Sequence, residues 1–232
     1  MKPKTKAFLK KAWHFIWEDD SVLSWLVNIA LAFVLIKFIV YPGLGFILQT
    51  THPVVAVVSE SMEHGMNRNL NSYMLCDKSF SQKERINYDG YWEACGKWYE
   101  DNFKITKEQF GEFSFKNGFN KGDIMVLKGA KPGNIEVGDV IVFTSKKPDP
   151  IIHRVVNKWE KKGEYYYHTK GDHNRVSIKD TLIDETNIHQ SQVIGKAVFK
   201  VPFMGYIKIW FNQIICYNPV KQALSNFLVM PC

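Results

Sequence analysis

The pattern of hydrophobic and polar positions first marks out one long apolar segment, residues 21–49. At a helical rise of about 1.5 Å per residue it is long enough to cross a hydrocarbon core of about 30 Å. Lys37 is its one charged residue, and we expect it to reach an interface or face a neighbouring helix. A cleaved signal peptide is the alternative. The run is too long for one, and no small-x-small site follows cleanly, so we predict a retained transmembrane anchor.

The segment before the anchor, residues 1–20, mixes basic and apolar residues in a helical pattern. The basic residues are Lys2, Lys4, Lys6, Lys10 and Lys11. Such a segment suits a helix that lies among lipid headgroups. Because these lysines precede the anchor and no Lys or Arg occurs between Lys37 and Arg68, we predict a cytoplasmic amphipathic tail and an extracytoplasmic domain over residues 50–201.

After residue 50 the pattern changes to short β-branched and alternating runs bounded by turn residues. The predicted strands are Pro53–Ser59, Gly122–Leu127, Gly138–Phe143, Ile151–Trp159, Tyr165–Thr169 and Gln192–Val201. Lys161-Lys162-Gly163 joins two of them as a predicted hairpin turn. Many short strands separated by turns are typical of an antiparallel fold, so we predict a mainly β domain.

Residues 65–119 interrupt the strands with an aromatic and charged stretch, which we predict to be a partly helical insertion. The expected helices are Tyr88–Asp101 and Thr106–Phe110, and Thr106 with Gln109 has the spacing of a capping box. The helically spaced aromatic residues are Tyr88, Tyr91, Trp92, Trp98, Tyr99 and Phe103. They fit the small core of the insertion better than a binding surface.

The C-terminal residues 202–232 begin with an apolar stretch, 202–217, that is short and interrupted by Lys208, Asn212 and Gln213. A length near the lower limit for a membrane span leaves two interpretations open. The segment is either membrane-associated or a second transmembrane helix.

Composition places most of the chain in water. Of the 232 residues 46% are hydrophobic, and the formal net charge is +7. A mean hydropathy of -0.20 is too low for a polytopic membrane protein. The basic excess fits attraction to anionic lipid. The lysines are dispersed and no nucleic-acid motif occurs, so we expect no nucleic-acid partner.

The four cysteines are Cys76, Cys95, Cys216 and Cys232, and no Cys-x-x-Cys pair suggests zinc. Cys76 and Cys95 lie in the segment predicted outside the cell, where a disulfide is chemically allowed. A disulfide and two free thiols both stay open. A metal site of these two cysteines with His64 is disfavoured, because the spacing is not that of metal ligands.

Three residues are candidates for nucleophilic catalysis: Ser61, His153 and Asp172. Serine needs a base to take its proton, histidine titrates near neutral pH, and a carboxylate holds the imidazole in one tautomer. Singly, each has an ordinary interpretation, as a turn serine, a partly buried strand histidine and a turn aspartate. The flanking sequences of the three, taken together, are what give them weight as a set.

The sequence around each candidate resembles the archaeal and endoplasmic-reticulum type of signal peptidase I, a family of serine peptidases. Ser59-Glu60-Ser61-Met62 resembles its Ser-x-Ser-Met motif. Ile152-His153-Arg154-Val155 resembles its His-Arg-Val motif, and Gly171-Asp172-His173-Asn174 its Gly-Asp-x-Asn motif. The strand Gly138–Phe143 also matches, whereas residues 65–119 do not.

The resemblance implies roles for the matched residues. Ser61 would be the nucleophile and His153 its base. The Ser59 hydroxyl and the Ser61 backbone N–H would stabilise the oxyanion. The family has a second functional aspartate a few residues after Asp172. The best match is Asp180, slightly beyond the usual spacing, so the partner of His153 is either Asp172 or Asp180, and we favour Asp180.

The family also implies a substrate. An extended peptide with small residues one and three positions before the cut bond would add as a strand beside the β-branched run. The residues expected to contact it are Val54, Val55, Val57, Val58 and Met62, with Met62 near the membrane-facing side.

The expected function is a plasma-membrane serine endopeptidase that removes signal peptides from exported preproteins. It would have a signal-peptidase-like antiparallel β domain, and neither a metal nor an organic cofactor is implied. Its partners would be preproteins and the lipid bilayer, with accessory subunits left open. The alternatives are a catalytically silent membrane scaffold of the same fold and a protease for a specialised set of precursors.

Overall fold

The computed structural model describes residues 3–65, 67–69, 72–81 and 86–206. The chain divides into two compact units, Met1–Ile47 and Leu48–Cys232. Most of the C-terminal stretch 202–217, together with Cys216 and Cys232, lies outside the described residues.

The first unit is helical. It comprises α1 (Pro3–Trp17), α2 (Val22–Leu35), a π-helical turn (Ile36–Val40) and α3 (Tyr41–Leu48), the last of which ends in the second unit. The hydroxyl of Ser21 caps α2 by accepting a hydrogen bond from the Ser24 N–H. Helical residues run unbroken from Val22 to Leu48, and this 27-residue stretch is long and apolar enough to span a membrane. The apolar N-terminal helix expected from the sequence is therefore confirmed.

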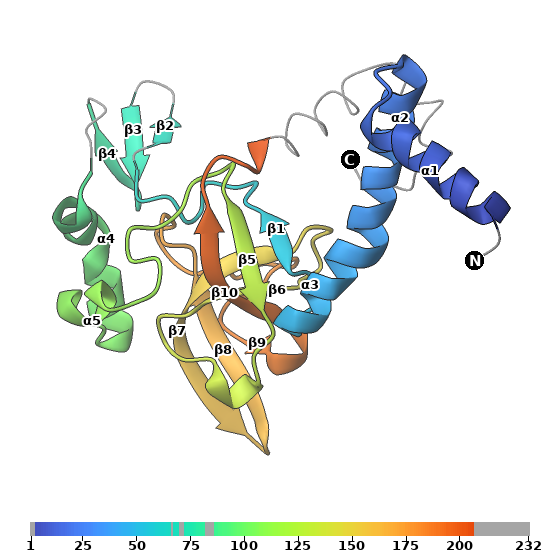
Figure 1. Ribbon diagram of the computed structural model, residues 1–232. Coiled ribbons are helices and arrows are strands. Elements are labelled where there is room, and N and C mark those ends of the chain that lie inside the picture. The colour runs from blue at the N-terminus through green and yellow to red at the C-terminus, as the bar shows by residue number, and fades with distance from the viewer. Residues whose placement is uncertain (1–2, 66, 70–71, 82–85, 207–232) are drawn as a thin grey trace. The chain divides into compact units, whose positions relative to one another are not determined.

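The second unit is built on a seven-stranded sheet in which every pair of neighbouring strands is antiparallel (Figure 1). Its order is β1-β5-β10-β6-β7-β8-β9. The strands are β1 (Val54–Ala56), β5 (Ile124–Lys128), β6 (Val140–Phe143), β7 (Ile151–Lys161), β8 (Glu164–Lys170), β9 (Ile188–His189) and β10 (Val193–Val201). The predicted mainly β antiparallel fold is confirmed.

The hairpin between β7 and β8 shows why the sequence turns where it does. Lys162 and Gly163 connect the strands, with φ of 56° and 80°. A two-residue type I′ turn, whose twist matches that of the strands, has positive φ at both positions, and glycine adopts it without strain. This hairpin carries His153 on β7 and leads into Asp172 after β8.

Between β1 and β5 the chain forms a second small sheet and two helices. The strands β2 (Asn67–Asn69), β3 (Ser72–Leu75) and β4 (Lys78–Phe80) precede α4 (Tyr88–Phe103) and α5 (Lys107–Gly111). Thr106 and Gln109 form the expected capping box on α5. The three strands were not anticipated. A disulfide joins Cys76, in the β3–β4 turn, to Cys95 on α4, which settles the question of bridge or thiols.

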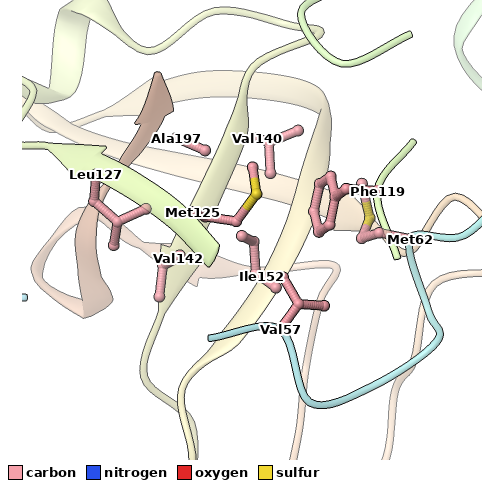
Figure 2. Packing of buried hydrophobic residues seen from close by; sticks show 9 residues of the cluster. All are labelled: Val57, Met62, Phe119, Met125, Leu127, Val140, Val142, Ile152 and Ala197. Atoms are coloured by element: carbon pink, nitrogen blue, oxygen red, sulfur yellow. The ribbon is translucent and has the colours of Figure 1, made fainter. Parts of the chain in front are cut away.

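The buried side chains form three clusters. One, drawn in Figure 2, lies where β1, β5, β6, β7 and β10 face one another, with Met125 in its middle. A second holds the aromatic residues of α4 and reaches Val156 on β7, so the aromatic spacing of α4 builds a core as expected. A third contains Ile141, Val155 and Tyr167. The insertion core is thus continuous with the main sheet.

Met125 tests the packing of the first cluster, because its side chain has no exposed surface. We expect Met125→Ala to lower the free energy of unfolding by about 2–5 kcal/mol, since it leaves a cavity among rigid neighbours. Urea unfolding measures this loss. The matched control is Val198→Ala on β10, where the side chain is 45% exposed. A similar loss in both variants would contradict the assignment of Met125 to the core.

Candidate active site

Ser61 and His153 meet although 92 residues separate them. The Ser61 Oγ lies 2.8 Å from the His153 Nε2. Ser61 is half-buried in the loop that follows β1, and His153 is buried on β7, opposite Ile141 of β6. A half-exposed hydroxyl against a buried imidazole is the arrangement in which a base can take the serine proton.

The other imidazole nitrogen, Nδ1, is hydrogen-bonded to the carboxylate of Glu185. Glu185 is fully buried, and other groups hold its carboxylate. Thr169 Oγ1 donates to Oε1 at 3.0 Å, and the Ile178 N–H donates to Oε2 at 2.6 Å. A carboxylate fixed on Nδ1 leaves Nε2 free to accept the proton of Ser61.

This geometry corrects the expectation that an aspartate holds His153. Asp180 is exposed, and its carboxylate accepts the N–H groups of Leu182 and Ile183 in a local turn. Asp172 is buried, but its carboxylate bonds to residues other than His153. The acid on Nδ1 is a glutamate 13 residues after Asp172, because an irregular loop and a bridge between Lys179 and Asp184 return the chain to His153.

Asp172 is instead the centre of a buried polar network. The Arg154 guanidinium donates to both of its carboxylate oxygens, at 2.9 and 2.7 Å. His64 Nε2 lies 2.9 Å away, and the Tyr99 hydroxyl donates at 3.1 Å. Burial alone would raise the pKa of Asp172, but the charge of Arg154 and the hydrogen bonds from His64 and Arg154 outweigh it, so the pKa lies well below its usual range.

Arg154 has no exposed surface and ties the network to distant segments. Its remaining N–H groups donate to the carbonyl oxygens of Ser114, Phe115 and Gly138 at 2.7–2.9 Å. Its guanidinium also stacks over the Phe110 ring, 4.8 Å from the centroid. One side chain therefore fixes the end of the insertion and the start of β6 to the loop that follows β8.

Lys170, the last residue of β8, is a second buried cation. Its ammonium group donates to the carbonyl oxygens of Gly171 and Asp172 at 3.1 and 3.2 Å. It also lies 4.7 Å from the centre of the Tyr99 ring. Burial lowers the pKa of Lys170 from 10.5 to about 8, only partly offset by Asp172.

The loop Gly171–Asn174 touches Ser61 and His153 directly. The His173 N–H donates to the Ser61 carbonyl oxygen at 2.8 Å. A Cβ on Gly171 would lie 2.8 Å from both the His153 Nε2 and the Ser61 carbonyl oxygen. Any larger residue would therefore push against the imidazole, so the sequence needs glycine here.

The two donors expected at the oxyanion, the Ser59 hydroxyl and the Ser61 N–H, lie beside the Ser61 hydroxyl. The hydroxyl groups of Ser59 and Ser61 are 3.1 Å apart, and Ser59 is exposed. Within the described residues the Ser61 backbone N–H donates to no protein acceptor. Both groups are thus available to an oxygen that develops charge.

The residues expected to contact a peptide fall into two groups. Val54 and Val55 lie on β1, which has a neighbouring strand on only one side within the described chain, and Val58 is 49% exposed. Val57 and Met62 are buried in the first core cluster and present no surface to a ligand.

The register of β1 shows which of its groups are unpaired. Val57 donates to Asp123 and Pro53 accepts from Leu127, so odd-numbered residues bond to β5. The N–H and C=O groups of Val54, Ala56 and Val58 therefore point to the open edge of the sheet.

No protein-family model matches the chain. Curated proteins do. Over 114 residues it is 32% identical to signal peptidase complex catalytic subunit SEC11C of Homo sapiens, covering 48% of this chain and 58% of that protein. Over 118 residues the chain is 32% identical to signal peptidase complex catalytic subunit SEC11 of Colletotrichum graminicola, and the match covers 50% of this chain and 67% of that protein. Over 127 residues the chain is 30% identical to signal peptidase complex catalytic subunit SEC11 of Fusarium vanettenii, and the match covers 50% of this chain and 70% of that protein. The chain thus spans less than two thirds of the mammalian relatives.

The two aspartates should differ sharply in their effect on stability. Asp172→Asn leaves Arg154 buried without its counter-charge, so we expect the free energy of unfolding to fall by about 3–5 kcal/mol. Asp180→Asn should leave it nearly unchanged, because an amide oxygen still accepts the two turn N–H groups. Urea unfolding of both variants measures the difference, and equal losses would rule out the network as described.

Lys170 predicts a pH dependence of stability. Its pKa is about 8 in the folded protein and about 10.5 when unfolded, so between these values the unfolded chain binds more protons. The free energy of unfolding should therefore rise with pH across this window, by up to about 3 kcal/mol. Below pH 8 Lys170 is charged in the folded protein as well, so the penalty for burying its charge lowers the stability in full. Lys170→Met should remove this rise.

The test is to measure the free energy of unfolding of wild type and of Lys170→Met at pH 7 and at pH 10. The change between the two pH values in wild type, minus the same change in the variant, is the contribution of Lys170. Burial raises the pKa of Tyr91 and of Tyr99 well above its ordinary value in wild type, and both tyrosines are kept in the variant, so their contribution cancels in the difference. The matched control is Lys161→Met, which removes an exposed lysine of β7. The prediction is wrong when Lys170→Met keeps the wild-type rise.

Proposed function

We propose a function from one premise, that this chain belongs to the family of signal peptidase complex catalytic subunits. We propose that the protein is a membrane-anchored serine endopeptidase that removes signal peptides from exported preproteins. The observation that carries the proposal is the 2.8 Å contact between Ser61 Oγ and His153 Nε2, with Glu185 on the opposite ring nitrogen.

In the proposed reaction the Ser61 oxygen attacks the peptide carbonyl carbon while His153 Nε2 takes the hydroxyl proton. Glu185 holds the Nδ1–H tautomer and stabilises the imidazolium that forms. Collapse of the tetrahedral intermediate breaks the peptide bond, and His153 gives its proton to the leaving amine. A water molecule, activated by His153, then hydrolyses the Ser61 ester.

The oxyanion of each intermediate needs donors at the place where charge develops. We assign this role to the Ser61 N–H and the Ser59 hydroxyl. The unpaired state of the first and the 3.1 Å spacing of the two hydroxyl groups support the assignment.

The substrate is an extended segment that adds to the open edge of β1. Backbone groups of Val54, Ala56 and Val58 would pair with it, as in other cases of strand addition. Side chains of Val54, Val55 and Val58 would contact it, whereas Val57 and Met62 are buried in the first core cluster. Small residues before the cut bond are the specificity that family membership implies.

We propose that Val22–Leu48 anchors the enzyme in the plasma membrane with the N-terminus in the cytoplasm and the second unit outside. The Cys76–Cys95 disulfide supports a non-cytoplasmic site, because such bonds persist in oxidising compartments. The partners are preproteins and lipid, with accessory membrane subunits as a further expectation from the family.

The position of Asp180, slightly beyond the family's usual spacing, is an argument for the alternative of a silent scaffold, because such a scaffold needs no acid at His153. A carboxylate on His153 Nδ1 removes that support, since Glu185 can serve where Asp180 does not reach. A protease for a specialised set of precursors has the same site, and cleavage of several unrelated precursors separates it from a general enzyme.

Cleavage of a purified precursor with an Ala-x-Ala site, in detergent, tests the proposal. We expect Ser61→Ala and His153→Ala each to lower kcat by about 10⁴-fold or more. Glu185→Gln should cost about 10²–10⁴-fold, because the amide cannot stabilise the imidazolium.

The matched control for Glu185→Gln is Asp180→Asn, whose kcat should stay within about twofold of wild type because Asp180 does not touch His153. The proposed function fails when wild type does not cut or when Ser61→Ala cuts as fast as wild type. The assignment of Glu185 fails when Asp180→Asn is the more damaging change.

A further inference from the structure

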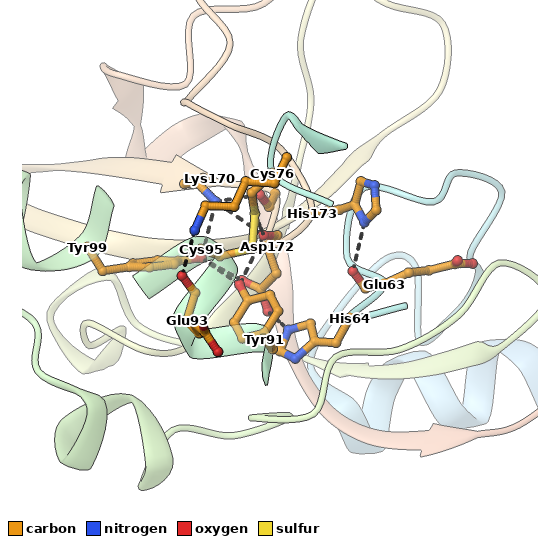
Figure 3. Close-up of a disulfide and its surroundings, with 12 residues drawn as sticks. Glu63, His64, Cys76, Tyr91, Glu93, Cys95, Tyr99, Lys170, Asp172 and His173 are labelled. Atoms are coloured by element: carbon orange, nitrogen blue, oxygen red, sulfur yellow. Dashed lines mark hydrogen bonds and ion pairs between the residues drawn. A yellow bond between two sulfur atoms is a disulfide. The ribbon is translucent and has the colours of Figure 1, made fainter. Parts of the chain in front are cut away.

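Three of the hydrogen bonds between the insertion and the loop that follows β8 hold His173 and Asp172 (Figure 3). The Cys76 N–H donates to the His173 carbonyl oxygen at 3.2 Å. The Tyr91 hydroxyl donates to the Asp172 carbonyl oxygen at 3.0 Å, and the Tyr99 hydroxyl to the Asp172 carboxylate at 3.1 Å. Each bond is made by a residue outside the segments that match the family motifs.

The same loop is in contact with the nucleophile. The His173 N–H bonds to the Ser61 carbonyl oxygen, and Gly171 packs against the imidazole of His153. The peptide groups of one residue, His173, thus link Cys76 to Ser61. A displacement of this loop changes the position of Ser61, and therefore its distance from His153.

The disulfide fixes the insertion end of this connection. Cys76 and Asp77 form the tight turn between β3 and β4, both with positive φ. The strand pairing of Leu75 with Lys78 closes this turn, and the disulfide to Cys95 attaches it to the middle of α4. The Cys76 N–H and the two tyrosine hydroxyl groups therefore belong to one cross-linked body.

A stacked pair adds a second hold near the nucleophile. The rings of His64 and Tyr91 lie 3.6 Å apart and almost parallel, with 2° between their planes. His64 lies three residues after Ser61 and also bonds to Asp172. Tyr91 is thus packed against the nucleophile segment through its ring while its hydroxyl holds the loop, and Figure 3 shows it beside both.

We propose that the insertion is a positioning element for the catalytic pair, in which Tyr91, Tyr99 and the disulfide-held turn at Cys76 keep the loop Gly171–Asn174 against Ser61. The inference rests on the proposed function for its effect on rate. It assigns a role to a segment that family resemblance leaves without one. It also makes full activity depend on an intact Cys76–Cys95 bond.

Tyr91→Phe combined with Tyr99→Phe is the first test. The change removes two hydroxyl groups and keeps both rings, so the aromatic core stays filled. We expect amide hydrogen exchange at His173 to quicken by about tenfold or more. We also expect kcat to fall by about tenfold with KM unchanged, because the loop orients Ser61 rather than binding peptide.

The matched control is Tyr88→Phe on the same helix. Its hydroxyl donates to the Lys107 carbonyl oxygen inside the insertion and makes no bond to the loop. Exchange at His173 and kcat should both stay at the wild-type value. If Tyr88→Phe changes exchange at His173 and kcat as much as the double variant does, Tyr91 and Tyr99 have only a structural role, and the proposal is overturned.

Cys76→Ser combined with Cys95→Ser is the second test and should reproduce both effects. Dithiothreitol should do the same to wild type, as its two thiols form a cyclic disulfide while the cystine takes up two electrons and two protons. It should leave the Ser variant unchanged, which separates this bond from the other cysteines of the chain.

The outcomes distinguish the two proposals. When wild type does not cleave the precursor, the proposed function fails, and exchange at His173 still decides whether the insertion holds the loop. When wild type cleaves but the variants exchange and cleave like wild type, only the positioning role is wrong. Faster exchange without loss of kcat also overturns it.

Discussion

The buried carboxylate of Asp172 is the interaction on which the arrangement of this site depends. Arg154 cannot lose its proton, and it has no exposed surface, so its charge requires a partner inside the protein. Asp172 provides that partner in two-pronged geometry. Because such a pair gives little net stability relative to apolar packing, its consequence is specificity of arrangement. It determines where the insertion, the start of β6 and the loop after β8 converge.

Two carboxylates consequently have separate tasks. Asp172 is engaged on all sides by Arg154, His64 and Tyr99, so it has no free lone pair directed at His153. Glu185 takes the imidazole instead, and its other hydrogen-bond donors among the described side chains and backbone groups, Thr169 and Ile178, are neutral. A carboxylate that is not already paired with arginine keeps its charge available to an imidazolium.

The parts of the fold that the sequence predicted are those set by local chemistry. Alternation gave the main strands, Lys162-Gly163 gave the hairpin, and Thr106 with Gln109 gave the capping box. The small strands β2 and β4 were missed because runs such as Asn67–Asn69 are short and polar, without an apolar face. Glu185 was missed because its place depends on the path of an irregular loop, which no periodicity records. Its only local signal is an acid between buried Ile183 and Ile188.

The register of the β7–β8 hairpin explains how one loop serves both networks. Consecutive residues of a strand point to opposite faces, so His153 and Val155 lie on one face of β7 while Arg154 and Val156 lie on the other. Val155 belongs to the third core cluster and Val156 to the core of the insertion. Arg154 pairs with Lys170 across the hairpin, so the chain leaving β8 presents Gly171 to the imidazole and Asp172 to the guanidinium. A slip of one residue would exchange the faces, separating His153 from Ser61 and leaving the arginine unpaired. The Ser61–His153 contact and the buried ion pair are therefore set by the same register, and neither can form correctly without the other.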